Sequence, residues 1–368
     1  MIGGSIDPVS RAQFRAAAEG RLPDPEEIDD GLWSLPMPMP GVLLSYTLAV
    51  VHLGPAGAVT LVDPGWGLPD SHERLGGFLR SQGRRLSDVA TVIVTHAHRD
   101  HLGFADELGA VTGATTVLST REMRALTVGA ATKIDQFDRM VAWGAPPDTA
   151  RHIADLRRAR RIGVRPPSGA VLLVEDGDVL PIDGVTWRVV LTPGHTAGHM
   201  CLEDADRRVL FSGDHVLPTV RPGIGLGGRL ESNPVADYLT SLERIKGFDD
   251  FEIVPGHGYR FRGLRWRRHD AVEHTLRRAR EVSAVVTADP CATVWEVASR
   301  LTWTAGWDQL VSTHLLFSGL AQTEMYRELV AEHESGELHA ANTEEFGAAF
   351  GLARGTSLRL ESGIGYTQ

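Results

Sequence analysis

The first strong hydrophobic pattern in the chain begins after residue 30. The segment LWSLPMPMPG is extended and stiffened by prolines, and we expect it to be a lead-in to a sheet or a lip beside one. Two apolar runs follow, VLLSYTLAVVHL and AVTLVDPG, with a glycine-bounded turn at GPAG between them. Apolar runs bounded by turn residues predict two neighbouring antiparallel strands. The first 30 residues are polar and helix-permissive.

Helices and strands alternate after these two runs. Helical periodicity in DSHERLGGFLRSQG precedes the short apolar run VATVIVT, and ADELGAVTG then predicts a helix before a strand in TTVLST. This alternation predicts a sheet covered by helices on its outer face. The rhythm breaks at about residues 120–168, where ATKIDQFDRMVAW and DTARHIADLRRARRIGV predict a helical insertion over the functional site.

The second half of the chain returns to strands and then ends in helices. Apolar runs in AVLLVEDGDVL, VTWRVVLTPGH and HMCLEDADRRVLFSGDH predict strands, and NPVADYLTSLERIKG predicts a helix before the last strand, FEIVPGHG. Beyond about residue 262 the pattern is helical. We therefore expect a lead-in at 1–30, a main domain at 31–262, a helical accessory domain at 263–345 and a tail at 346–368.

Composition narrows the class of protein. With 368 residues, 42% of them hydrophobic, the chain can form one large core and a smaller unit. The net charge of −10 argues against an obligate nucleic-acid binder. Two distant cysteines, Cys201 and Cys291, cannot form a disulfide framework. With no secretion signal at the N-terminus and no apolar run long enough to span a bilayer, we expect a soluble, cytoplasmic protein.

The densest cluster of side chains that can bind a metal ion is the segment THAHRDH at residues 95–101, where a predicted strand meets a helix. Alternate residues of an extended segment point the same way, so His96 and His98 can bind one metal ion, whereas Asp100 and His101, entering a helix, are turned toward a second. Borderline divalent ions such as zinc accept imidazole nitrogen and carboxylate oxygen. One short loop can therefore serve two ions.

Three further segments place a candidate ligand at the end of an apolar run: TPGHT with His195, SGDH with Asp214 and VPGHG with His257. Glycines 194, 213, 256 and 258 flank these ligands and let the backbone turn tightly beside them. The sequence resembles the metallo-β-lactamase superfamily, whose motif H-x-H-x-D-H, followed by single His, Asp and His positions, is matched in full and in order.

The resemblance implies the fold and a ligand set. The fold is α+β, a four-layer αββα metallo-β-lactamase sandwich. His96, His98 and His195 hold one metal, Asp100, His101 and His257 hold the other, and Asp214 bridges them, with a hydroxide between the ions. Zinc is the predicted metal, and manganese and iron are alternatives. Asp100 and Asp214 are the catalytic candidates.

Two neighbouring residues are further candidates. Asp63, in LVDPG, matches the family's Asp-x-Gly turn and is expected to accept a hydrogen bond from a ligand histidine, with an ordinary turn aspartate as the alternative. His215 follows the bridging aspartate, and the sequence leaves open whether it donates to substrate or packs in the core.

The region after the last ligand gives a second, looser resemblance. About residues 262–340, including THLLFSGL, look like the small winged-helix-like C-terminal domain of the β-lactamase-like 2 branch. The superfamily as a whole hydrolyses many substrates, so fold alone does not choose one. We favour hydrolysis of a carboxylic ester, a thioester of the acyl-CoA or carrier-protein type, or a lactone, with ribonuclease or phosphodiesterase activity second and β-lactam hydrolysis third. The alternative that is not an enzyme is a binding or regulatory module in which the metal ions have a structural role only.

Basic residues bear on the substrate because arginine binds phosphate in a bidentate manner. They form two clusters, Arg151, Arg157, Arg158, Arg160, Arg161 and Arg165 in the insertion, and Arg260, Arg262, Arg265, Arg267 and Arg268 after the last ligand. A solvated helix face paired with carboxylates is the alternative for each. We therefore expect a small-molecule substrate that can carry phosphate, disfavour nucleic acid without excluding it, and leave a homodimer open.

Overall fold

Two mixed β-sheets face each other in the computed structural model of the chain, which describes residues 5–41, 44–131, 135–159, 164–227 and 229–335. Each sheet has seven strands, in the orders β1-β14-β13-β12-β11-β10-β9 and β2-β3-β4-β5-β6-β7-β8. The predicted antiparallel pair after residue 42 is β4 with β5, as expected. Strands β5 to β8 then run parallel to one another.

The strands of the first sheet are β1 (Asp7–Pro8), β9 (Val179–Ile182), β10 (Val185–Leu191), β11 (Met200–Asp204), β12 (Val209–Gly213), β13 (Glu252–Pro255) and β14 (Phe261–Arg262). Those of the second are β2 (Glu26–Asp29), β3 (Leu32–Pro38), β4 (Tyr46–Leu53), β5 (Val59–Val62), β6 (Val89–Ile93), β7 (Thr115–Ser119) and β8 (Val171–Val174). The apolar runs of the sequence therefore coincide with strands.

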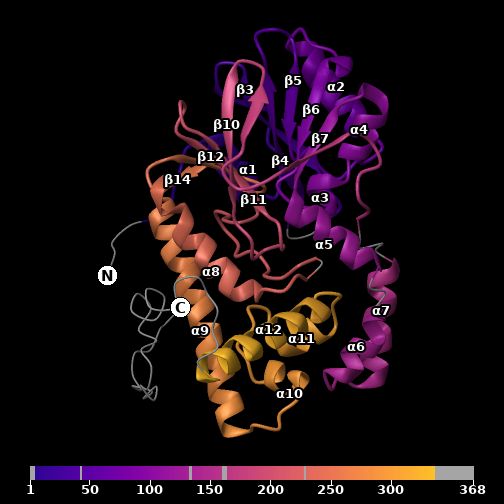
Figure 1. Ribbon diagram of the computed structural model, residues 1–368, viewed down its shortest axis with the longest axis vertical. Helices are drawn as coiled ribbons and strands as arrows, with labels where there is room; N and C mark the ends of the chain where they lie inside the picture. The colour runs from indigo at the N-terminus through magenta and orange to yellow at the C-terminus, as the bar shows by residue number, and fades with distance from the viewer. Residues whose placement is uncertain (1–4, 42–43, 132–134, 160–163, 228, 336–368) are drawn as a thin grey trace.

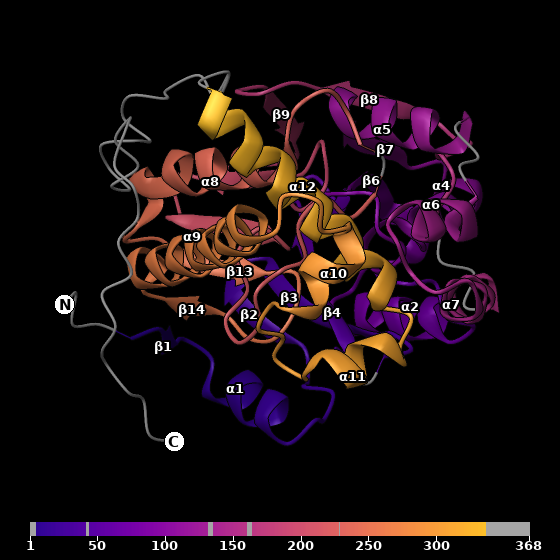
Figure 2. The ribbon, with the colours of Figure 1, turned by 90° about the horizontal axis from the view of Figure 1, so that it is seen from below.

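Helices cover the outer faces of both sheets (Figure 2). The helices that precede the last strands are α1 (Arg11–Ala18), α2 (Ser71–Ser81), α3 (Arg99–Leu102), α4 (Ala105–Thr112), α5 (Thr120–Ala131), α6 (Gln136–Ala142), α7 (Pro147–Ala159) and α8 (Pro234–Arg244). Those that follow are α9 (Leu264–Ala288), α10 (Val294–Ser299), α11 (Trp307–Val311) and α12 (Leu316–Ser335). This is the predicted α+β sandwich of two sheets between helical layers.

Three apolar cores hold the layers together because each sheet buries both of its faces. Trp187 and Phe211 fill the space between the sheets, with ring centroids 4.9 Å apart. Outside the second sheet, α2 and α4 pack Leu79 and Leu108 onto it. Outside the first sheet, α8, α9 and α12 form the third core. Burial on both faces explains why central strands such as β4, β5, β12 and β13 read as continuous apolar runs, whereas the outer strand β9 alternates between exposed and buried residues.

The proline-rich segment forms strand β3 itself rather than a lead-in or a lip. It pairs with β4 along Leu32–Pro38, whereas β2 covers its other edge only as far as Ser34. Pro36 and Pro38 lie beyond that point, where a missing N–H costs no hydrogen bond to β2. The first 30 residues also contribute strands: β1 pairs with β14, and β2 pairs with β3.

The helical insertion and the C-terminal helices share one core. Met140 of α6, Trp143 directly after it and Ile153 of α7 pack with Leu316 and Leu320 of α12. In Figure 1 these helices lie across the lower end of the two sheets, the end at which α3 is found. No strand lies among residues 264–335, so the likeness to a winged-helix domain is limited to its helices. In the described part of the chain, no helix is both long and apolar enough to cross a bilayer.

Candidate metal centre

The candidate ligands lie on loops that leave strands at one end of the sandwich. Strands β10, β12 and β13 of the first sheet run in the same direction and end just before His195, Asp214 and His257. Strand β6 of the second sheet ends just before the loop that carries His96 and leads into α3. Residues separated by up to 161 positions, His96 and His257, therefore meet where the two sheets open.

Three histidines converge to form the first group, His96, His98 and His195. Nε2 of His96 lies 2.9 Å from Nδ1 of His98, and Nε2 of His195 lies 3.1 Å from the same Nδ1. Two ligands of a tetrahedral zinc ion, each about 2.1 Å from the metal, are separated by roughly 3.4 Å. The nitrogens are thus close to the spacing that a shared cation requires.

The second group contains Asp100, His101 and His257. Nε2 of His257 lies 3.3 Å from Nε2 of His101 and 3.3 Å from Oδ2 of Asp100. Nε2 of His101 and Oδ2 of Asp100 are 3.9 Å apart. Two imidazoles and a carboxylate are again a donor set that suits a borderline divalent metal.

Asp214 lies between the two groups with one oxygen toward each. Its Oδ2 is 3.7 Å from Nε2 of His195, whereas its Oδ1 is 3.6 Å from Nε2 of His101 and 3.4 Å from Nε2 of His257. Oδ1 is buried and has no hydrogen-bond partner in the described structure. A buried carboxylate oxygen without a donor is costly unless a cation compensates it. The seven predicted ligands therefore come together in an arrangement that fits two metal ions.

The nitrogen that faces away from the centre is held on every ligand histidine. Nδ1 of His195 lies 2.6 Å from the carbonyl of Gly223, Nδ1 of His257 lies 2.7 Å from that of Tyr46, and Nε2 of His98 lies 3.2 Å from that of Leu226. A carbonyl only accepts, so these nitrogens carry the proton. The opposite nitrogen of each of these rings faces the centre, which is the orientation that a metal ligand needs.

Asp63 holds the remaining two ligand histidines. Its Oδ2 lies 2.8 Å from Nδ1 of His101 and accepts from Oγ1 of Thr95 at 2.7 Å. Because the Thr95 hydroxyl gives its proton to Asp63, its oxygen accepts from Nδ1 of His96 at 3.0 Å. One carboxylate oxygen therefore sets the ring orientation of one histidine in each group. Asp63 has a positive φ of 52°, which aspartate tolerates better than most residues.

Two buried residues that the sequence motifs did not single out connect the ligand loops. Glu122, at the start of α5, accepts from the backbone N–H of Ala97 at 2.8 Å and from that of Gly198 at 2.7 Å. His199 accepts from the backbone N–H of Asp214 through Nε2 at 3.1 Å, and its Nδ1 lies 2.8 Å from Oγ1 of Thr192. Neither residue lies in a ligand motif, and a lone Glu or His carries no local signal of such a role.

His215 lies beside the centre but is a core residue. Its side chain is fully buried, and its ring packs edge-on against Tyr238 with centroids 5.3 Å apart. Burial lowers the pKa of His215 to about 3, so the ring is neutral. Of the two alternatives left open by the sequence, the geometry supports packing rather than donation to a substrate.

The two groups differ in electrostatic potential. Burial, together with the neighbouring imidazoles, holds the pKa of His96 well below its usual range and lowers that of His195 to about 4. Burial also opposes protonation of His257, but Asp214 and Asp100 outweigh it and raise the pKa to about 10. In the same way, Asp63, Asp214 and Asp100 raise the pKa of His101. Carboxylates that favour a proton here also favour a divalent cation.

Glycines at the ligand loops allow a close approach of the backbone. A Cβ atom on Gly256 would lie 2.5 Å from Oδ1 of Asp214, and one on Gly213, whose φ is +46°, would lie 2.6 Å from Oγ1 of Thr95. Gly194 and Gly258 also have positive φ. A side chain at these positions would either collide with its neighbours or have to adopt an unfavourable positive φ, which explains why glycine lies beside these ligands.

Most arginines of the two predicted clusters are already engaged. Arg260 pairs with Glu26 and Glu252, while Arg267 and Arg268 are buried against carbonyls and the carboxylates of Asp270 and Asp249. In the insertion, Arg157 stacks on Phe317 and Arg158 pairs with Asp155. Arg160 and Arg161 lie outside the described residues, as does the tail at 346–368. The three buried arginines after the last ligand are therefore not available to bind phosphate.

Comparison with known proteins agrees with this geometry. The sequence model of the Metallo-beta-lactamase superfamily matches residues 41–257, a range that contains all seven candidate ligands. A crystal structure of a metallo-beta-lactamase family protein from Thermus thermophilus has 27% sequence identity and a TM-score of 0.67, covering 83% of this chain and 94% of that one. The sandwich and its C-terminal helical region are thus a known arrangement.

Two relatives carry names that bear on chemistry. The chain is 30% identical over 206 residues to acyl-coenzyme A thioesterase MBLAC2 from Bos taurus, which is 54% of this chain and 68% of that protein. It is 32% identical over 134 residues to Beta-lactamase-like protein 2 homolog from Caenorhabditis elegans, 36% of this chain and 43% of the relative. The match thus spans less than half of the latter protein.

Proposed function

This chain belongs to the metallo-beta-lactamase superfamily, and we propose that it is a binuclear metal-dependent hydrolase of a thioester, of the acyl-coenzyme A or carrier-protein type. Carboxylic esters and lactones are the related substrates, since each presents a carbonyl to the same nucleophile. The observation that carries the proposal is Asp214, whose two oxygens face two different groups of ligands.

The residues divide into two ligand sets. His96, His98 and His195 would hold one ion, and Asp100, His101 and His257 the other, with Asp214 shared. Zinc suits imidazole and carboxylate ligands without any thiolate, and manganese and iron are the alternatives. Divalent cations held by these residues would lower the pKa of a bound water molecule toward neutrality and would polarise the carbonyl of the substrate.

The protein's own groups orient this chemistry and move its proton. Asp100 has the most exposed side chain of the carboxylates at the centre, 15% against 8% for Asp214 and 4% for Asp63. It is therefore the carboxylate placed to accept a proton from the attacking water and to pass it on. Asp63 and Glu122 do not belong to the ligand sets. They hold in place a ligand ring, in the case of Asp63, and the ligand loops, in the case of Glu122.

A thioester is favoured over the other substrates by the relative named as an acyl-coenzyme A thioesterase. The thiolate of coenzyme A is a good leaving group, so hydrolysis needs no strong general acid beside the sulfur. Of the five arginines at positions 260–268, three are buried and cannot contact an RNA backbone, which disfavours a nuclease that would use this cluster.

The test is hydrolysis by the zinc-reconstituted protein of an acyl-coenzyme A and lactone panel beside a single-stranded RNA. Thiol release that is abolished by a chelator and restored by zinc is expected, with the RNA left intact. His96→Ala should abolish activity without changing the circular dichroism spectrum, whereas His152→Ala, on the exposed face of α7, should not. RNA cleavage without thioester hydrolysis contradicts the proposed substrate, and full activity of His96→Ala contradicts the proposed centre.

A further inference from the structure

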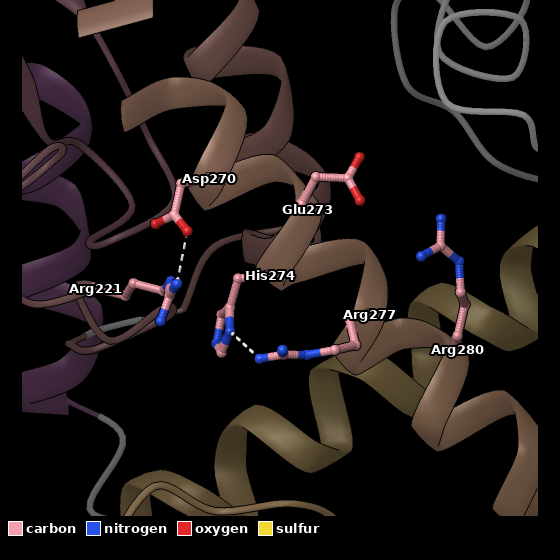
Figure 3. A pocket seen from close by; sticks show the side chains of 6 residues that line it. All are labelled: Arg221, Asp270, Glu273, His274, Arg277 and Arg280. Carbon is pink, nitrogen blue, oxygen red and sulfur yellow. Dashed lines mark hydrogen bonds and ion pairs between the residues drawn. The ribbon is translucent and has the colours of Figure 1, made fainter. Parts of the chain in front are cut away.

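A pocket separate from the metal centre lies between helix α9 and the segment that follows strand β12 (Figure 3). Its volume is about 220 Å³. Six charged or titratable side chains line it: Arg221, Asp270, Glu273, His274, Arg277 and Arg280. Arg221, Arg277 and Arg280 belong to neither of the two arginine clusters noted in the sequence.

The centre of this pocket is a set of hydrogen-bond donors. Figure 3 shows Arg221 and Arg277 on either side of His274, and Nη2 of Arg277 lies 2.9 Å from Nδ1 of His274. Since guanidinium only donates, Nδ1 accepts and the neutral ring carries its proton on Nε2. Burial, with the nearby cations Arg221 and Arg277, lowers the pKa of His274 to about 4. Donors and positive potential together suit an anion.

The carboxylates of the pocket do not cancel this charge. Asp270 is shared between two arginines, at 2.7 Å from Arg221 and 2.6 Å from Arg267. Glu273 is exposed, and Figure 3 shows its carboxylate directed away from His274. Arg277 and Arg280 have no carboxylate partner in an ion pair among the described residues. Two guanidinium groups therefore remain available to a ligand.

The pocket is connected to the metal centre by a short stretch of chain. Arg221 is two residues before Gly223, whose carbonyl lies 2.6 Å from Nδ1 of the ligand His195. Two residues of extended chain span at most about 7 Å. The backbone of Arg221 is therefore no more than about 7 Å from that of the residue that holds His195.

We infer that this pocket binds a phosphate group of a phosphopantetheine thioester, an assignment that rests on the proposed function. In phosphopantetheine, roughly thirteen bonds separate phosphorus from sulfur, equal to little more than four residues of extended chain, or about 15 Å. With the sulfur at the metal centre, the phosphate reaches the region of Arg221. Coenzyme A and a phosphopantetheinylated carrier protein present the same group, so both are candidate carriers.

The test compares substrates with and without phosphate. The variant Arg277→Gln/Arg280→Gln removes two exposed charges, and Arg265→Gln, exposed on the same helix, is the matched control. We expect the double variant to lower kcat/KM for acyl-coenzyme A about tenfold, through KM, because a charge-assisted hydrogen bond to phosphate is lost. Acyl-pantetheine, which has no phosphate, should be unaffected, and Glu273→Gln should lower KM for acyl-coenzyme A.

Acyl carrier protein distinguishes the source of the phosphate. If the double variant lowers kcat/KM equally for carrier-protein and coenzyme A thioesters, the pocket holds the phosphate next to the pantetheine. If the double variant lowers kcat/KM for the coenzyme A thioester alone, the pocket holds a phosphate of the nucleotide. Equal effects on phosphorylated and unphosphorylated thioesters overturn the inference.

Calorimetry supplies a readout that does not depend on catalysis. Coenzyme A should bind to the metal-free protein more tightly than pantetheine does, and the double variant should remove the difference. Equal affinities of wild type and double variant for coenzyme A also overturn the inference. If the wild type hydrolyses no thioester, the proposed function fails, and the calorimetric measurement still decides whether the pocket binds phosphate.

Discussion

Replacement of Asp63 by asparagine tests how the ligand histidines are oriented. The change keeps the size of the side chain, and asparagine tolerates the positive φ of 52° at this position. The amide oxygen can still accept from the backbone N–H of Thr95, which lies 2.8 Å from Oδ1. The amide nitrogen, however, takes the place of Oδ2 and points its N–H groups at Oγ1 of Thr95 and Nδ1 of His101. An acceptor of two hydrogen bonds becomes a donor.

The effect on His101 can be estimated from this reversal. To accept from the new amide, Nδ1 must lose its proton, and Nε2, which faces Asp214 at 3.6 Å, must gain one. A protonated Nε2 has no lone pair for a metal. Hydrogen bonds to charged groups are worth about 1.5–3 kcal/mol, and loss of such a partner to a ligand histidine commonly reduces metal affinity or activity by about 10- to 100-fold. We expect a decrease in this range for both zinc affinity and kcat/KM.

Zinc affinity is measured by competition with a chromophoric chelator, and folding by circular dichroism. Asp183→Asn is the matched control, because Asp183 accepts from the backbone N–H of Ala56 at 3.0 Å and of Ala58 at 3.3 Å, away from the centre. A zinc affinity of Asp63→Asn within about twofold of the wild type, far below the usual 10- to 100-fold loss, would refute the argument that this carboxylate selects the histidine tautomers.

Three further outcomes are expected. Glu122→Gln should lower the free energy of unfolding by about 1–3 kcal/mol in urea, because an amide N–H replaces an acceptor of buried backbone donors. Glu231→Gln, at an exposed residue that pairs with Arg124, should leave the free energy of unfolding unchanged. Zinc at 100 times its Kd should stabilise the protein by about 2.7 kcal/mol in thermal unfolding, and an unchanged Tm after chelation would contradict a folded-state site. By NMR, His274 should titrate near pH 4 and stay neutral above it. Its contribution to the free energy of unfolding is therefore present above the pKa of the unfolded state and is lost as the pH falls toward 4. Arg277→Gln should raise the pKa of His274, and an unchanged pKa would show that the charge of Arg277 does not act on this ring.

The sequence determined the sandwich and the candidate ligand set because both depend on local patterns. Strands buried on both faces read as continuous apolar runs, as in β12, and Asp214 follows that run directly. The histidines and carboxylates of THAHRDH are adjacent in the chain, so their convergence needs only a strand end and a helix start. The predicted contact of Asp63 with a ligand histidine also followed from a local motif.

The tertiary structure decided what depends on distant partners. Whether Arg260, Arg267 and Arg268 are free or buried depends on carboxylates and carbonyls elsewhere in the fold, and charge along the sequence does not carry that information. Glu122 became part of the centre because α5 places it against two ligand loops. Likewise, the packing of α6 and α7 against α12, and the pocket around His274, join segments 49 or more residues apart. Such neighbours are selected by the packing of whole layers, which minimises the apolar surface left in water rather than following any periodicity in the chain.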